Sequence, residues 1–297
     1  MRITHNMIHS NVLRDIMGNF ERAAKLHEQG SSGLKIRYPS DDAIVATRAS
    51  NINSRLRELQ QYQRNINTVE STLKAYDSTV LEMSALTYRV RELMVQGAND
   101  TLTPDDRKTI AMEIDRIRDH MIQLANTQVA GNHIFGGARA DQAPVTMDGV
   151  IRMDPAADRK LTTDLGGYPF AYNITVYEVF TVSGNESIFN LLENQSANLK
   201  ADNPDFYLND IALEKMDRFE LQIQQMISHN GASQNFLEMA KNRYSEFEQF
   251  MTEYLSKEQD ADFLEVYTKL TMADTALQAA LKTGASIMLP TLVDFMR

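Results

Sequence analysis

The sequence predicts a mainly α-helical protein: a long, antiparallel, coiled-coil-like helical rod built from both chain ends, with a small β-rich domain inserted in the middle. Glycine (13 of 297) and proline (7 of 297) are scarce against average usage of about 7% and 5%. Few turns therefore divide the chain. Apolar residues at spacings of three and four run from Ile52 to Met94, and no glycine or proline interrupts residues 43–96. At 1.5 Å per residue they predict a helix of roughly 80 Å, which needs other long helices beside it.

The first helix is predicted within residues 1–30, where Leu13, Ile16, Phe20 and Ala23 form one stripe. It ends at the loop Gly30–Gly33. A second helix starts after Pro39–Asp42, because serine and aspartate cap helices and acids favour the first turn. A third starts at Thr103–Asp106, with threonine as N-cap, proline at the first position and two acids after it. Its short connection makes it an antiparallel neighbour of the second helix.

Seven of the 13 glycines fall within residues 131–205, where the composition changes. Val145–Arg152 and Tyr168–Val182 are rich in β-branched and aromatic residues and alternate, which predicts strands separated by turns. Ser187–Leu199 is predicted as a short helix. Helical spacing then returns and continues, with a break near 260, to Pro290.

Five segments follow from these patterns. They are an N-terminal assembly helix (1–40), the N-terminal half of the rod (41–130), the β-rich insert (131–205), the C-terminal half of the rod (206–259) and a C-terminal assembly helix (260–297).

Composition excludes several classes of protein. The chain has no cysteine, which removes disulfides, thiolate catalysis and cysteine-bound metals. A net charge of −10 argues against nucleic-acid binding. No apolar run approaches the roughly 18 residues of a membrane span. The first residues do not form an ordinary cleaved signal.

Residues that could carry chemistry have simpler interpretations. His5 and His9 are spaced to share a metal, but no third ligand lies near them in the sequence. Asp41-Asp42, Asp105-Asp106 and Asp260/Asp262 stand where helices begin, which the helix dipole explains. Gly131–Gly137 lacks the lysine and the following helix of a phosphate loop. We find no catalytic constellation, and we expect neither an enzyme, nor a cofactor, nor a metal.

Several segments together resemble the bacterial flagellin family. Gly33–Asp42 resembles the segment after the first helix of flagellins. Arg91–Asp100 and Asp105–Arg107 are similar to the family's central rod. Asp260–Asp262, Ala276–Ala279 and Leu292–Met296 resemble its carboxyl terminus. Within the family, Gly131–Gly137 and Arg64–Met83 are most similar to hook-associated protein 3, the hook–filament junction branch.

The resemblance implies a structural subunit that polymerises at the hook–filament junction of the bacterial flagellum. Its implied partners are hook-associated protein 1, flagellin, copies of itself, a flagellar export chaperone and the type III export apparatus, without nucleic acid or membrane. It implies export from the cell to an extracellular position.

The terminal stripes have too few partners within one chain, so we expect them to order when subunits assemble. The residues expected to carry assembly are Leu13, Ile16, Phe20, Phe263, Val266, Leu270, Ala273, Leu277, Ala280 and Ile287. Three alternatives stay open: a flagellin filament subunit, a coiled-coil adaptor that forms small oligomers, and an enzyme housed in the insert.

Overall fold

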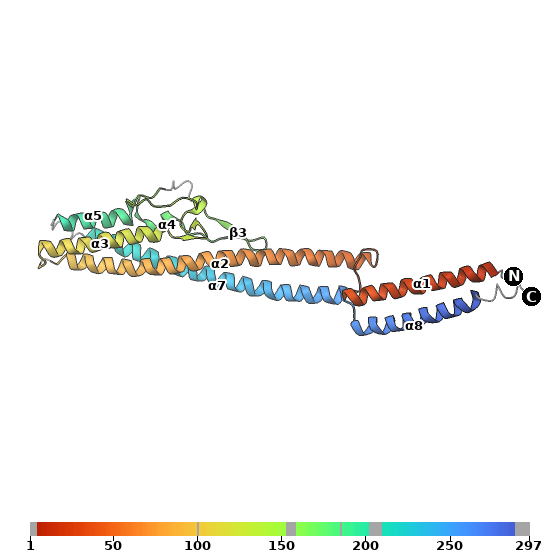
Figure 1. The fold of residues 1–297 in the computed structure, drawn as a ribbon. Coiled ribbons are helices and arrows are strands. Elements are labelled where there is room, and N and C mark those ends of the chain that lie inside the picture. Colours follow the sequence, from red (N-terminus) through yellow and green to blue (C-terminus); the bar gives the residue numbers. More distant parts are fainter. Residues whose placement is uncertain (1–4, 100, 153–158, 185, 202–209, 289–297) are drawn as a thin grey trace, which may run out of the picture. The chain divides into compact units, whose positions relative to one another are not determined.

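A computed structural model describes residues 5–99, 101–152, 159–184, 186–201 and 210–288. The chain divides into two compact units. We call residues 1–58 with 246–297 the terminal unit, and residues 59–245 the central unit. Two helices are continuous through both units: α2 (Ala43–Gly97) and α7 (Asp210–Gln259) (Figure 1).

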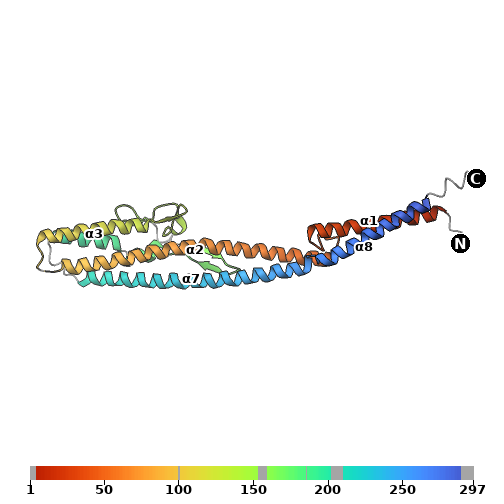
Figure 2. The same cartoon turned by 60° about the horizontal axis from the view of Figure 1, so that its bottom comes forward.

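In the central unit, α2 and α7 are antiparallel (Figure 2). Glu70 forms an ion pair with Lys241 at 2.9 Å, and Arg91 forms one with Asp217 at 2.8 Å. Between them, Asn230 donates a hydrogen bond to the Leu73 carbonyl at 3.1 Å. Residue numbers thus fall on α7 as they rise on α2, which confirms the antiparallel helical rod.

Helix α3 (Pro104–Ala125) begins where the sequence predicts it. The Thr103 side chain accepts a hydrogen bond from the Asp106 N–H, and the Asp106 carboxylate accepts one from the Thr103 N–H, which completes a capping box. Helix α5 (Ile188–Lys200) packs on α3, where Ser196 donates to the Ala111 carbonyl at 3.2 Å. The predicted short helix after Ser187 is therefore confirmed.

The strands of the insert are short antiparallel pairs: β1 (Gln128–Val129) with β2 (Asn132–His133), β3 (Thr162–Asp164) with β4 (Pro169–Ala171), and β5 (Thr181–Ser183) with β6 (Glu186–Ser187). A short 3₁₀ helix, η1 (Gly137–Arg139), follows β2. Gly131 adopts φ +84° in the turn between β1 and β2, so Gly131–Gly137 is the turn from rod to insert.

One strand expectation is wrong. Within Tyr168–Val182 the structure forms helix α4 (Val176–Phe180), although these residues alternate as a strand would. Thr175 and Glu178 form a second capping box, with the Glu178 N–H bonded to the Thr175 hydroxyl at 3.4 Å. Capping satisfies the free N–H groups of the first turn, and this local term outweighs the β propensity of valine and tyrosine. Val145–Arg152 likewise contributes only one isolated bridge, Val145 to Ile151.

The core of the central unit is an aromatic chain. Tyr76, Phe135, Phe180 and Phe189 are fully buried, and successive ring centroids are 5.3, 5.5 and 5.1 Å apart. The Tyr76 hydroxyl donates to the Ile134 carbonyl and accepts the Ile174 N–H at 3.2 Å. Burial raises the pKa of this phenol, so it keeps the proton that it donates. The core therefore ties the insert to the rod helix α2.

In the terminal unit, α1 (His5–Ser32) packs antiparallel to α8 (Phe263–Met288) (Figures 1 and 2). The predicted helices 1–30, 43–96 and 263–287 are thus all present. We keep the five-segment division of the sequence as a proposal about how the chain works.

Candidate assembly surface

The seam between α1 and α8 repeats at spacings of four and three on both helices. Its residues are buried or half-buried: Val12, Ile16, Asn19, Ala23, Leu26 and Gly30 on α1, and Val266, Leu270, Ala273, Leu277, Ala280 and Gly284 on α8. Two strict repeats of this kind are typical of a coiled-coil pair.

Small residues let the two helices approach closely. A Cβ on Gly284 would lie 3.0 Å from Ile16 Cδ1 and 3.2 Å from Val12 Cγ1. A Cβ on Gly30 would lie 3.6 Å from Val266 Cγ1. The seam is narrow, so each helix covers only one stripe of the other.

A second apolar stripe on each helix is exposed to solvent. Phe20 is 63% exposed and Leu264 is 74% exposed. Other exposed apolar side chains of the pair are Met7, Leu13, Met17, Phe263, Tyr267, Met272 and Leu281. Monomeric proteins rarely leave so many large apolar groups together on one small unit, and such surfaces mark sites of protein–protein contact.

The structure divides the residues that the sequence singled out for assembly. Ile16, Val266, Leu270, Ala273, Leu277 and Ala280 lie on the seam inside one chain. Leu13, Phe20 and Phe263 are exposed. Ile287 lies in α8, but its side chain is outside the described residues.

Four seam residues of α1 escaped the sequence analysis: Val12, Asn19, Leu26 and Gly30. The predicted stripe on α1 mixed the two faces, since Ala23 is buried whereas Leu13 and Phe20 are exposed. The strict repeat on α1 passes through Asn19 and Gly30, which a search for large apolar residues skips. The strict repeat on α8 is apolar or small throughout and was found.

A compact joint connects the seam to the long helices. Lys35 N–H donates to the Gln259 carbonyl at 2.8 Å, and Ala261 N–H donates to the Gly33 carbonyl at 2.9 Å. Gly33 adopts φ +72°, a conformation that favours glycine. The segment that connects α1 to α2 is thus hydrogen-bonded to the segment that connects α7 to α8.

The aspartates at the joint start helices, as the sequence predicts. Asp42 accepts the N–H groups of Ile44 and Val45 at 2.9 and 3.1 Å. Asp262 accepts those of Leu264 and Glu265 at 2.9 and 3.2 Å. Both carboxylates therefore cap helices.

Asp41 holds the loop before α2. Its carboxylate pairs with Lys25 on α1 at 2.8 Å and accepts the N–H groups of Arg37 and Tyr38, each at 3.2 Å. The hydrogen bond from Lys25, followed by those from the two backbone N–H groups, lowers the pKa of Asp41 to about 2. The joint is thus fastened by a carboxylate that stays ionised at neutral pH.

Within the described part of the chain, no group of three or more histidines and acids is arranged to hold a metal ion. His9 is half-buried on α1, and the side chain of His5 is outside the described residues. Nor does any described helix have the length and hydropathy of a bilayer span.

Comparisons with known proteins agree on one family. Residues 3–140 match the family model described as the bacterial flagellin N-terminal helical region. Flagellar hook-associated protein 3 of Escherichia coli is 25% identical over 302 residues, which cover 95% of each protein. A flagellin of Clostridium tyrobutyricum is 26% identical over 224 residues, which cover 68% of this chain and 58% of that flagellin.

Among solved structures, a putative flagellar hook-associated protein from Vibrio parahaemolyticus has the same fold. The TM-score is 0.67 at 23% identity, and the match covers 74% of this chain and all of that structure. This neighbour supports the helical fold and adds nothing by itself about partners.

Proposed function

We propose that the chain is a member of the bacterial flagellin family and a structural subunit of the hook–filament junction, an adaptor between hook-associated protein 1 and flagellin. The observation that carries this proposal is the match to a hook-associated protein 3 over 95% of both chains. The family is one of structural components of the flagellum, so motility is the process that the chain serves.

The terminal unit supplies a physical means of polymerisation. A neighbouring subunit that covers one exposed side chain such as Phe20 or Leu264 contributes about 1.5–3 kcal/mol of apolar burial. Each subunit presents several such groups on two helices. Copies of the chain would therefore add contacts between subunits to the pairing of α1 with α8 within one chain, and so stabilise one another's terminal helices further.

The same proposal extends to export and location. We infer that the subunit leaves the cell through the flagellar type III apparatus with a cytoplasmic chaperone, and acts outside the cell as a non-enzymatic component. The two helices of the terminal unit contact each other along only one stripe. Such limited packing suits a chain that must unfold for export and fold again at the tip of the flagellum.

A single introduced cysteine tests the location, because the chain has none of its own. Met147 is 85% exposed, so a Met147→Cys subunit can be labelled with a fluorescent maleimide on intact cells. We expect one spot between each hook and its filament. The cysteine-free parent, labelled in the same way, is the control.

Deletion of the coding region is the companion experiment. We expect hooks without filaments, and flagellin released into the medium. Normal filaments in the deletion strain would refute the junction role.

The flagellin relative supports one other candidate, a subunit of the filament itself. In that case the Met147→Cys label would run along the whole filament. A coiled-coil adaptor or an enzyme in the insert would leave the isolated flagellum unlabelled.

A further inference from the structure

The part of α7 within the terminal unit carries three exposed aromatic rings in a row. Phe247, Phe250 and Tyr254 are 43%, 59% and 40% exposed. Spacings of three and four residues place them on one face of the helix, and successive ring centroids are 6.3 and 6.4 Å apart. Met251 and Leu255 are half-buried and belong to the inner face. We call these three rings the ladder. They form an apolar surface distinct from the seam of α1 and α8.

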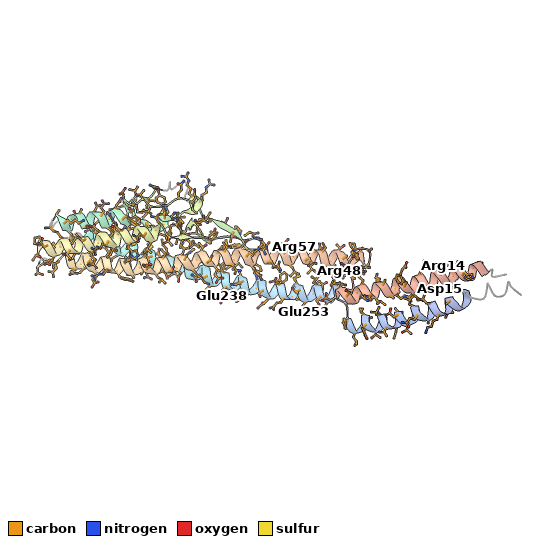
Figure 3. All side chains as sticks on the ribbon, in the orientation of Figure 1. Arg14, Asp15, Arg48, Arg57, Glu238 and Glu253 are labelled. Carbon is orange, nitrogen blue, oxygen red and sulfur yellow. The ribbon has the colours of Figure 1, made fainter. Side chains whose placement is uncertain are left out.

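The same stretch of α7 is acidic. Residues 246–259 hold four glutamates and one lysine. Glu246 and Glu253 are exposed beside these rings, and Figure 3 marks Glu253 on α7. The surface therefore combines aromatic rings with negative charge, and it suits a partner that combines apolar groups with arginine or lysine.

The neighbouring stretch of α2 has the opposite character. Residues 43–58 hold three arginines and one glutamate. Arg48 and Arg55 are exposed and lie on one face of the helix with Ile44, which is 67% exposed, whereas Arg57 lies on another face. Figure 3 marks Arg48 and Arg57 along this helix. Ala49 and Ile52 occupy the inner face instead.

Within one chain, these arginines and glutamates form few ion pairs between α2 and α7. Arg48 reaches Glu258 at 3.7 Å across the two helices. Arg55 pairs with Glu58 on its own helix at 2.8 Å, and Glu253 pairs with Lys257 on its own helix at 2.7 Å. Such exposed pairs along one helix are weak and exchange readily for others.

We propose that the aromatic, acidic face of α7 in one copy docks on the basic face of α2 (residues 43–58) in a second copy. Both halves of the contact are present on every chain, with opposite charge, in the same unit. The two surfaces differ, so the contact is head-to-tail and can repeat around a ring or along a tube. The inference rests on the proposed function, because only an assembling subunit brings many copies together.

Charge reversal tests the contact in the full chain. One variant carries Arg48→Glu with Arg55→Glu, two changes on the same face of α2, and the other carries Glu246→Lys with Glu253→Lys. All four side chains are exposed. Each variant alone would face a neighbour of like charge, and we expect about a tenfold loss of self-association by sedimentation at low salt.

An equal mixture of the two variants should recover self-association. In alternating copies, the glutamates of the first variant face the lysines of the second, and the remaining contact has its native charges. Circular dichroism of each variant controls for folding. Absence of recovery in the mixture, with both variants folded, would overturn the proposal.

Cross-linking gives an independent readout. Asn51→Cys on α2 and Gln249→Cys on α7 place one exposed cysteine on each proposed face. With a short bismaleimide we expect mixed dimers of one Asn51→Cys and one Gln249→Cys chain, and few dimers from either variant alone. Thr109→Cys, an exposed position on α3, is the matched control and should give little product with either partner.

The outcomes separate this inference from the proposed function. Labelled subunits that reach the junction but give no mixed cross-link on isolated flagella would refute the α2–α7 contact and leave the junction role intact. Dimers of Asn51→Cys with itself would show a symmetric contact and also refute it. Cross-links from either cysteine to a different flagellar protein would assign the surface to that protein instead of a second copy.

Discussion

Two polar side chains, Tyr76 and Asp41, each hold separate segments of the chain together by hydrogen bonds. Tyr76 joins the rod helix α2 to the carbonyl of Ile134 and the N–H of Ile174. Asp41 joins α1 to the loop before α2. The first group is buried and the second lies at the surface, so their removal should have different consequences.

Tyr76→Phe should lower the free energy of unfolding by about 1–3 kcal/mol, because it leaves buried backbone groups without their partner. Urea unfolding measures the effect. Tyr88→Phe is the matched control, because Tyr88 is 48% exposed on the same helix. Equal losses in the two variants would contradict the role assigned to Tyr76.

The joint should weaken only in strong acid. Asp41 has a pKa of about 2 in the folded chain against 3.8 ordinarily. Its stabilising contribution is therefore complete above about pH 4 and is lost as the pH falls toward 2. Carboxyl NMR titration should give the low midpoint in the wild type and, in Lys25→Met, a midpoint closer to the ordinary value. A midpoint unaffected by Lys25→Met would rule out the ion pair as the main cause.

Helices α1 and α8 each have two apolar faces, one in the seam and one exposed. Two leucines of α8, one on each face, allow the two faces to be tested separately. Leu277 is half-buried on the seam, whereas Leu281, one turn further, is 50% exposed. Leu277→Asp should break the pair within one chain, because it places a carboxylate between closely packed helices. Leu281→Asp should leave the pair intact and block contact with a neighbour.

Hydrogen exchange and a motility assay read these effects separately. We expect faster exchange of α1 amides in Leu277→Asp, and wild-type exchange with lost motility in Leu281→Asp. Wild-type exchange in both variants would mean that the seam does not order α1 in the free subunit.

For the whole molecule, packing quality differs between the two units. The largest fully buried side chains, among them Tyr76, Phe135 and Phe219, all lie in the central unit. The buried apolar residues of the terminal unit, such as Ala23, Ala49 and Val266, retain 6–8% exposure. The central unit therefore holds the core that stabilises the free subunit.

A fragment of residues 59–245 should fold alone. It retains every fully buried large side chain of the described chain, so its thermal midpoint should lie within a few degrees of that of the full subunit. Calorimetry of the two proteins measures the difference. A fragment that melts without cooperativity would show that the terminal unit is part of the folding core.

The sequence by itself determined the long helices and the cap of α3, but not the short helix α4. Unbroken spacing of apolar residues defined α2, Thr103-Pro104 fixed the start of α3, and the repeat from Val266 to Gly284 marked the seam of α8. These are local properties of one segment, set by helical periodicity and by hydrogen bonds to neighbouring residues. The resemblance to flagellins rests on motifs of the same local kind.

The tertiary structure alone decided which apolar groups are covered. Leu13 and Ile16 share one predicted stripe, yet only Ile16 meets α8, because the partner helix selects the face through the small residue Gly284. The insert likewise joins the core through Tyr76, a contact between residues 98 positions apart. Spacing along a helix reports that a residue is apolar on a given face, but burial requires a second surface that comes from elsewhere in the chain.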